Sequence, residues 1–393
     1  MSLRDKLNRS NVDKGDNTDL TLERIKRFGV IENPFPQASQ TVGNPRMDDT
    51  NEDSQIVAAI ESFEASYRSQ VIVIEGTQGS GKTNLLNHYQ RELKELYQED
   101  ETFYIIRYYP DPEPTFDSIV RRIFQELGED HLNAIARDLA KLDRSSAESV
   151  IDEAVNHEVR IVLWKLKGSF KKKGEETENP DVIPAALEWL LGLRVLKKHR
   201  EHLGVNFRLD TVESKTQALR DLVAVSERLE LLKGIFLMLD ELEKQDDTLG
   251  KTVVVRYLSA IRALIDALPK RLFLMLGITP VAKQRYFSLL PAIASRLQTV
   301  VSLPFVRSSE EAQLIAEFYI KNARERATQD PKYKSEELGN DDLITAENIR
   351  KIFDTAAEEA RRKGSEGVTH RALLHRLHNE AEKTLNNISN DRT

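Results

Sequence analysis

Apolar and polar positions divide the middle of the chain into two kinds of element. Short runs that are almost wholly apolar predict buried strands. Between them, apolar residues recur every three or four positions, which predicts amphipathic helices. The predicted strands are 71–76, 102–110, 234–242 and 271–279, and the predicted helices beside them are 54–67, 84–97 and 252–268. Because such strands alternate with helices, we expect an α/β fold with a central parallel sheet covered on both faces.

Two further parts of the chain are predicted to be helical only. Residues from about 115 to 233 show no strand alternation, and this length far exceeds an ordinary loop. We therefore expect a long helical insert in the α/β domain, and a C-terminal all-α domain. The expected insert helices are 115–128, 131–143, 147–168, 182–202 and 213–231, and the later helices are 308–326, 345–363 and 369–385. The predicted domains are 1–50, a polar segment with a short apolar island at 28–37; 51–304, the α/β domain; and 305–393, the helical domain.

Composition narrows the class of protein. The 393 residues are 40% apolar and 31% charged, which is typical of a soluble globular chain of two or three domains. No apolar run approaches the roughly 20 residues that span a bilayer, and the N-terminal segment lacks a signal-peptide core. The absence of cysteine excludes disulfides and fits the reducing cytoplasm. A net charge of −7 argues against a surface coated for nucleic acid, although a local basic patch stays open.

The segment 76–83, GTQGSGKT, matches the phosphate-binding pattern G-x-x-x-x-G-K-[ST] in full. It follows a predicted buried strand and precedes a predicted helix, as this pattern requires. Its glycines let backbone N–H groups turn toward phosphates, and the helix N-terminus adds positive potential. Lys82 is expected to reach the β- and γ-phosphates of ATP, and Thr83 to place its hydroxyl on Mg²⁺. The expected nucleotide contacts here are Gly76, Gly79, Ser80, Gly81, Lys82, Thr83 and Asn84.

Two carboxylates end the predicted strand 234–242. Asp240 suits a Mg²⁺ partner, and Glu241 suits a base that orients and polarises an attacking water. The alternative is that two acids simply open a polar loop. Kinases of nucleotides and metabolites need an acceptor pocket on the substrate side, and nothing in the sequence offers one. Together with the phosphate-binding segment, the acidic pair therefore indicates hydrolysis by water.

Two single residues are candidates for further roles in that chemistry. Thr279 ends the next predicted strand, where it would hold the attacking water or the γ-phosphate, or would only cap the turn before Pro280. Arg296 follows a helix of the α/β domain. It would reach the γ-phosphate of a neighbouring subunit, or would be a surface residue at a helix C-terminus.

Two basic segments are weaker candidates. His370 and Arg371 open the last predicted helix and would contact the nucleotide from the helical domain. The stretch 163–174 interleaves lysines with Trp164 and Phe170, which suits phosphates and stacked bases, but equally suits a solvated helix end with two core aromatics. Its lysines are Lys165, Lys167, Lys171, Lys172 and Lys173.

The assembled motifs resemble those of the AAA+ ATPases and, within them, the origin-recognition and initiator-loader clade. The resemblance covers about residues 30 to 385 and rests on NPFP at 33–36, the phosphate-binding segment, LMLDE, LGIT, SR at 295–296 and a helical lid, in that order. It implies that Pro34 and Phe35 lie near adenine and that Lys82 and Thr83 are Walker A. It also implies that Asp240 and Glu241 are Walker B, Thr279 sensor 1 and Arg296 the arginine finger.

Three departures from that clade matter. Its basic sensor-2 residue follows a glycine by three places, which here gives His370 after Gly367, with Arg371 next to it. No winged-helix DNA-binding domain is expected after the lid. The insert at 115–233 is also much longer than in a minimal AAA+ domain. The segments around 214–225 and 233–244 are similar to ATPases of bacterial anti-phage defence systems.

Two functions follow from the resemblance. The first is an oligomeric motor or switch that hydrolyses ATP with Mg²⁺ and acts on DNA or a DNA-processing protein. The second is an ATP-dependent scaffold with negligible turnover that recruits an effector protein.

Overall fold

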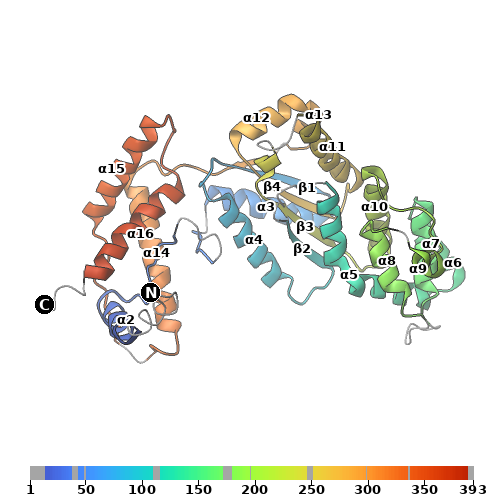
Figure 1. Ribbon diagram of the computed structural model, residues 1–393, viewed down its shortest axis with the longest axis horizontal. Coiled ribbons are helices and arrows are strands. Elements are labelled where there is room, and N and C mark those ends of the chain that lie inside the picture. The colour runs from blue at the N-terminus through green and yellow to red at the C-terminus, as the bar shows by residue number, and fades with distance from the viewer. Residues whose placement is uncertain are drawn as a thin grey trace, which may run out of the picture. The chain divides into compact units, whose positions relative to one another are not determined.

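The computed structural model describes nearly the whole chain, and it falls into two compact units (Figure 1). The helical unit comprises the described residues of Met1–Thr50, Gly76–Leu85 and Leu303–Thr393, and the α/β unit those of Asn51–Glu75 and Leu86–Ser302. The described residues are 14–37, 43–47, 50–108, 116–170, 179–194, 196–245, 251–297, 299–334 and 337–387. The loop at 76–83 therefore groups with the C-terminal helices, although the chain enters it from the α/β unit.

The α/β unit is built on one parallel sheet of five strands, in the order β2-β3-β4-β1-β5. This confirms the predicted α/β fold with a central parallel sheet. The strands are β1 (Gln70–Glu75), β2 (Phe103–Tyr108), β3 (Gly234–Leu239), β4 (Leu272–Ile278) and β5 (Thr299–Ser302). Every residue of β3 and β4 is buried, which explains their unbroken apolar sequences. The fifth strand escaped prediction because it has four residues, of which only Val301 is buried.

Aromatic side chains pack together against the sheet. The ring of Phe63 lies 5.4 Å from that of Phe236 and 5.6 Å from that of Phe273, in edge-to-face geometry. All three rings are fully buried, so replacing one of them with alanine would cost about 3–5 kcal/mol. The helices of this unit outside the insert are α3 (Asn51–Ser66), α4 (Lys82–Leu96, whose first turn groups with the helical unit), α11 (Lys251–Ala267), α12 (Pro280–Leu289) and α13 (Pro291–Ala294).

The insert is helical as predicted and shares one hydrophobic core with the sheet. Its helices are α5 (Phe116–Lys141), α6 (Arg144–Ile151), α7 (His157–Lys167), α8 (Val182–Leu190), α9 (Lys197–Leu203) and α10 (Val212–Arg228). The predicted break at Gly128 is present as a kink inside α5, where φ is 66° and ψ is −171°. Only glycine adopts this backbone conformation readily. The single helices predicted at 147–168 and 182–202 are each two helices.

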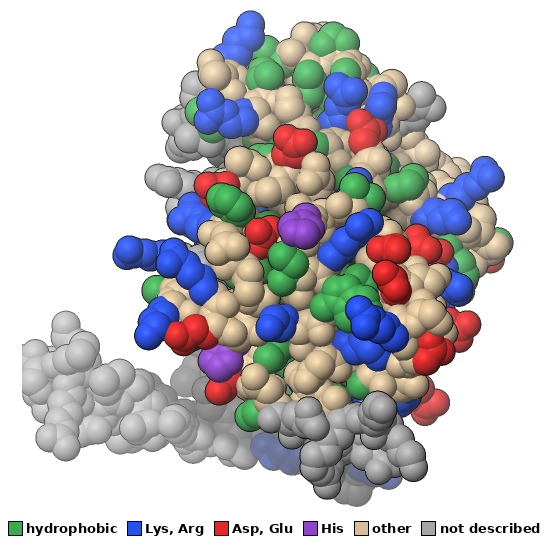
Figure 2. Space-filling view, turned by 90° about the vertical axis from the view of Figure 1, so that its right-hand side faces the viewer, with side chains coloured by type: hydrophobic (Ala, Val, Ile, Leu, Met, Phe, Trp, Pro, Cys, Tyr) green, Lys and Arg blue, Asp and Glu red, His purple; other side chains and the backbone are tan. Residues whose placement is uncertain are grey.

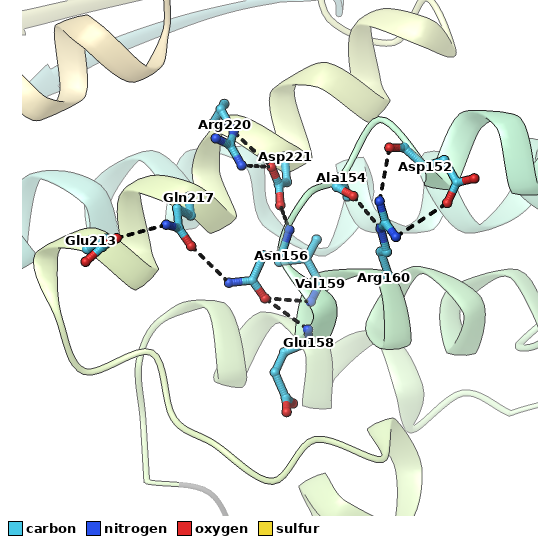
Figure 3. A network of polar contacts seen from close by, with 10 residues as sticks. All are labelled: Asp152, Ala154, Asn156, Glu158, Val159, Arg160, Glu213, Gln217, Arg220 and Asp221. Carbon is cyan, nitrogen blue, oxygen red and sulfur yellow. Dashed lines mark hydrogen bonds and ion pairs between the residues drawn. The ribbon is translucent and has the colours of Figure 1, made fainter.

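A network of polar contacts lies where α6 gives way to α7 (Figure 3). The Asn156 side chain caps α7 by accepting hydrogen bonds from the N–H groups of Glu158 at 2.9 Å and Val159 at 3.3 Å. The Asn156 N–H in turn donates to the fully buried carboxylate of Asp221 at 2.6 Å, and Arg220 pairs with the same carboxylate. Apolar helical spacing continues across this turn, which is why the sequence analysis predicted one helix; α6 ends at Ile151 and α7 begins after the cap Asn156.

The helical unit consists of α2 (Lys14–Phe28), α14 (Ser309–Gln329), α15 (Ala346–Arg362) and α16 (His370–Asn387) around a second hydrophobic core. The sequence analysis predicted no helix in the polar N-terminal segment, and residues 14–28 form α2. Ile25 and Phe28 are three residues apart and both buried, whereas most other residues of α2 are polar. Across the described ranges, no helix combines the length and apolarity needed to cross a membrane.

Candidate nucleotide-binding and catalytic site

The phosphate-binding loop depends on backbone shapes that glycine provides. Gly79 and Gly81 have φ values of 82° and 104°, in the left-handed region that L side chains rarely adopt. A Cβ on Gly76 would lie 2.2 Å from the Ser80 hydroxyl oxygen, so no side chain fits there. The N–H of Leu85 donates to the Gly81 carbonyl at 2.9 Å, as expected in the first turn of α4. The preceding N–H groups of that turn have no partner within the helix, which makes them suitable for an anion.

Polar side chains of the loop point inward. The Lys82 ammonium, on a residue only 7% exposed, donates to the carbonyls of Gly76 at 2.7 Å and Thr77 at 3.3 Å. The Ser80 hydroxyl is buried and has no hydrogen-bond partner among the described residues. This donor set of ammonium, hydroxyl and helix N–H groups fits a polyphosphate. Thr83 lies half-buried on the first turn of α4, and a hydroxyl there fits Mg²⁺ held by phosphates.

Asn84, the last expected contact of this loop, has a partner within the helical unit. Its amide donates to the Pro45 carbonyl at 3.3 Å, and the hydroxyl of Tyr319 donates to the same carbonyl at 3.2 Å. Asn84 therefore holds the segment 43–47 beside α14. A contact between Asn84 and a nucleotide stays a prediction.

The first turn of α16 lies against the phosphate-binding loop. The Arg371 N–H donates to the Gly79 carbonyl at 3.0 Å, and Thr369 caps the helix by accepting from the Ala372 N–H at 3.3 Å. His370 is half-buried, whereas the Arg371 side chain is exposed. Both candidates for a nucleotide contact from the helical domain are thus next to the loop, and the structure adds a main-chain contact that the sequence did not suggest.

The NPFP segment packs into the helical unit. The Asn33 amide donates to the His378 carbonyl and to the Glu382 carboxylate, both at 3.0 Å. His378 Nδ1 donates to the Phe35 carbonyl at 2.7 Å. Pro34 and Phe35 are buried, and the Phe35 ring lies 6.1 Å from that of Tyr319. These contacts explain the motif as an attachment to α14 and α16, while a contact with adenine stays a prediction.

The carboxyl edge of the sheet brings the predicted acids beside a residue that the sequence analysis missed. Asp240 directly follows β3 and is 4% exposed. Its Oδ2 accepts a hydrogen bond from the Arg107 guanidinium of β2 at 2.8 Å, and its Oδ1 accepts from the Glu241 N–H at 2.9 Å. Arg107 and Asp240 thus form a buried ion pair. The sequence did contain one indication of this role, because Arg107 is the single charged residue in the strand FYIIRY.

Glu241 has an unusual backbone. Its φ of 47° is in the left-handed region, which costs a non-glycine residue about 1 kcal/mol and which Tyr67, Glu230 and Arg271 also adopt. The next residue, Leu242, begins a short 3₁₀ helix, and the Tyr286 hydroxyl of α12 donates to the Leu242 carbonyl at 3.0 Å. Tyr286 of α12 thus holds the residue that follows Glu241.

Strand β4 lies between β1 and β3, and Thr279 follows it. The Thr279 hydroxyl accepts from the Ala282 N–H at 3.3 Å and so caps α12, as the simpler interpretation expected. Its own proton is still available to donate. One turn later, Lys283 pairs with the Glu75 carboxylate at 2.7 Å, and Ser302 of β5 donates to the same carboxylate at 3.1 Å. Glu75 is the residue before the phosphate-binding loop, and the sequence analysis missed this pair.

Arg296 is engaged within its own chain. Its Nε donates to Asp266 Oδ1 of α11 at 3.0 Å, and another guanidinium nitrogen donates to the Ser295 hydroxyl at 2.7 Å. About a third of its side chain is exposed. Asp266 also pairs with Arg262 at 3.3 Å. An action of Arg296 on a neighbouring subunit would require exchange of this ion pair.

One lysine of the stretch 163–174 in the insert has a structural role. The Lys167 ammonium donates to the carbonyls of Leu139 and Leu142, each at 2.7 Å, and burial lowers its pKa. Lys165 is exposed, and Lys171, Lys172 and Lys173 lie outside the described residues. Figure 2 looks onto the side of the α/β unit where α6, α7 and α9 lie, and Lys and Arg are interspersed there with Asp and Glu. The visible surface is therefore no continuous basic field.

Comparison with known proteins agrees with the loop and the sheet. Residues 65–163 match the model of a protein family described as AAA domain. The matched part of the chain, which holds the phosphate-binding loop, therefore resembles an AAA domain. Among curated proteins, none matches the sequence.

Two solved structures of the Aeropyrum pernix ORC2 protein resemble the chain. The structure of its ADPNP–ADP complexes is 14% identical, with a TM-score of 0.42, and the match covers 88% of this chain and 72% of that one. The structure of its ADP form is 12% identical, with a TM-score of 0.39, and the match covers 90% of this chain and 73% of that one.

Proposed function

We propose that this chain binds ATP with Mg²⁺ and hydrolyses it to ADP and phosphate. The observation that carries the proposal is the phosphate-binding loop itself. Its glycine-dependent turns, inward-facing Lys82 and buried Ser80 hydroxyl form a polyphosphate cradle at the start of α4. In this role Lys82 binds the β- and γ-phosphates, and Thr83 and Asp240 hold Mg²⁺, which neutralises phosphate charge.

Glu241 and Thr279 serve the attacking water. Glu241 accepts a proton as the water oxygen bonds to the γ-phosphorus, and the bond from that phosphorus to the β–γ bridging oxygen breaks, leaving ADP. Thr279 caps α12 through its oxygen and donates its hydroxyl proton to the water or the γ-phosphate. The hydrogen bond from the Tyr286 hydroxyl to the carbonyl of Leu242, the residue after Glu241, supports a positioned base at Glu241.

Nucleotide state is then transmitted to α16. The hydrogen bond from the Arg371 N–H to the Gly79 carbonyl joins the loop to α16. A change in the loop conformation on binding ATP therefore shifts the first turn of that helix. We propose that the protein works as a homo-oligomer, with Arg296 stabilising transferred charge in a neighbour, a contribution of about 10³–10⁵ in rate. The proposed partner is DNA or a DNA-processing protein.

An ATP-dependent scaffold with negligible turnover is the second candidate. The ion pairs of Asp240 with Arg107 and of Arg296 with Asp266 favour it, because both engage residues that hydrolysis would use. The two functions differ in turnover and share nucleotide binding.

The test compares wild type with Lys82→Ala and Glu241→Gln. We expect Lys82→Ala to lose nucleotide binding, and Glu241→Gln to bind ATP but to lose at least about 100-fold in turnover. Both are followed by calorimetry and phosphate release, and oligomer size is measured by light scattering with a slowly hydrolysed ATP analogue, with and without duplex DNA. Wild type that binds ATP but shows no turnover, even with DNA, supports the scaffold. Wild type that binds no nucleotide overturns both functions.

A further inference from the structure

We propose that Arg107 is a positioning residue that weakens the dependence of nucleotide binding on Mg²⁺, by neutralising Asp240. The inference rests on the proposed function, because it concerns the metal partner of that site. Arg107 is the penultimate residue of β2, where it pairs in register with Met238 of β3. Its side chain is 1% exposed and that of Asp240 is 4% exposed, and their charged groups meet at 2.8 Å.

The burial of the Arg107 guanidinium requires a physical explanation. Removing an arginine from water costs several kcal/mol, on the order of the gain from its ion pair, so the pair is a poor source of stability. A large apolar residue would fill the same position in β2 more cheaply. The ion pair brings the positive charge of Arg107 to the end of β3, directly onto Asp240.

Asp240 is held from two directions. Arg107 occupies Oδ2, and the Glu241 N–H occupies Oδ1, which also faces Gly277 so closely that a Cβ there would lie 2.8 Å away. A carboxylate oxygen accepts two hydrogen bonds, so each oxygen keeps one lone pair for a metal or for a water on the metal. Asp240 is thus fixed in place and still able to accept.

The charge of the pair decides what Asp240 contributes. An isolated carboxylate attracts Mg²⁺, but a carboxylate paired with a guanidinium carries no net charge, and the guanidinium repels the metal. In a buried setting this repulsion is not screened by solvent. Mg²⁺ is then held mainly by Thr83 and the phosphates, and it strengthens nucleotide binding less than it would with a free carboxylate.

The experiment measures the dissociation constant of ADP by calorimetry, once with Mg²⁺ and once with EDTA. ADP separates binding from turnover. We define the magnesium ratio as the constant in EDTA divided by the constant in Mg²⁺. In Arg107→Gln, which removes the charge but keeps an N–H donor for Asp240, the magnesium ratio should rise at least about tenfold over wild type. In the matched control Arg107→Lys, which keeps the charge, it should stay within about threefold.

An unchanged or lower magnesium ratio in folded Arg107→Gln would mean that Arg107 is merely structural. The double variant Arg107→Met/Asp240→Asn guards against failure to fold, because it replaces the pair by neutral groups. Its magnesium ratio should equal that of wild type within about threefold, and a larger fall would overturn the proposal, since Asp240 would then contribute its full charge. If wild type binds ADP in neither buffer, the nucleotide site itself fails. If binding is intact and only the ratios disagree, this inference alone fails.

Discussion

The main-chain N–H of Arg371 donates a hydrogen bond to the carbonyl of Gly79, so the last helix of the chain is tied to the phosphate-binding loop at 3.0 Å. The approach is close enough that a Cβ on Gly79 would lie 2.9 Å from the Arg371 Cβ. The glycine at this position therefore serves both the left-handed turn of the loop and the seat of α16.

Gly79→Ala should weaken ADP binding at least about tenfold, because both the backbone conformation and the contact with α16 must change. Gly43→Ala is the matched control. Gly43 has a similar φ of 78°, but its Cβ would meet nothing within 4 Å among the described residues. That variant should lose about 1 kcal/mol of stability at most and bind ADP normally. Calorimetry and thermal unfolding measure the two effects, and normal ADP binding by Gly79→Ala would contradict the double role.

Thr279→Ala should lose both a helix cap and a catalytic hydroxyl. The cap is worth about 1 kcal/mol, and we expect ATP turnover to fall at least about tenfold. Thr211 of the same unit caps α10 through a hydrogen bond of 3.0 Å from the Ser214 N–H, so Thr211→Ala should cost similar stability without loss of turnover. Thr279→Ser should restore both properties. Equal ATP turnover in Thr279→Ala and Thr211→Ala would mean that Thr279 only caps α12 and has no catalytic role.

Arg296 is tested by complementation between subunits. Arg296→Ala and Lys82→Ala should each be inactive alone, because one lacks the finger and the other the phosphate-binding lysine. In a mixed oligomer, the Lys82→Ala subunit supplies Arg296 to a neighbour with an intact loop, so part of the turnover should return. Arg262→Ala, which removes the other partner of Asp266, is the control and should stay active. A mixture without turnover speaks against action in trans.

His131 should make the α/β unit sensitive to mild acid. It is buried between Tyr104 and Ser226, each 2.8 Å from a ring nitrogen, and burial lowers its pKa from 6.5 to about 4. His131 is therefore protonated near pH 6.5 in the unfolded chain but only near pH 4 in the folded chain. This contribution to the free energy of unfolding is lost as pH falls through that window, by up to about 3 kcal/mol.

Urea unfolding of wild type and His131→Gln between pH 7 and pH 4 measures this effect. The variant should show a flatter profile, since glutamine does not titrate. His375, exposed on α16, provides the control, and His375→Gln should leave the wild-type profile unchanged. A profile for His131→Gln as steep as that of wild type would assign the acid sensitivity to other groups.

Local pattern alone determined much of this protein. The phosphate-binding loop, the acidic end of β3 and the parallel sheet were all predicted, because motif, strand and helix there depend on residues close in sequence. The boundaries of α14 and α16 also lie within a few residues of those expected. Where the local signal was weak, elements were missed, as with β5 and its four residues and α2 with its mostly polar sequence.

Tertiary structure decided which distant groups meet. Arg107 and Asp240 are 133 residues apart, and they pair only because β2 lies beside β3 in the sheet. Glu75 pairs with Lys283, Arg296 with Asp266, and Asp221 accepts a hydrogen bond from the Asn156 N–H, each across a long stretch of sequence. The sequence position of a charged residue does not indicate which distant residue it will contact. The sequence could therefore assign these residues to helices and strands but could not predict their pairs. Strand order and helix packing set those distances, and with them the electrostatics of the site.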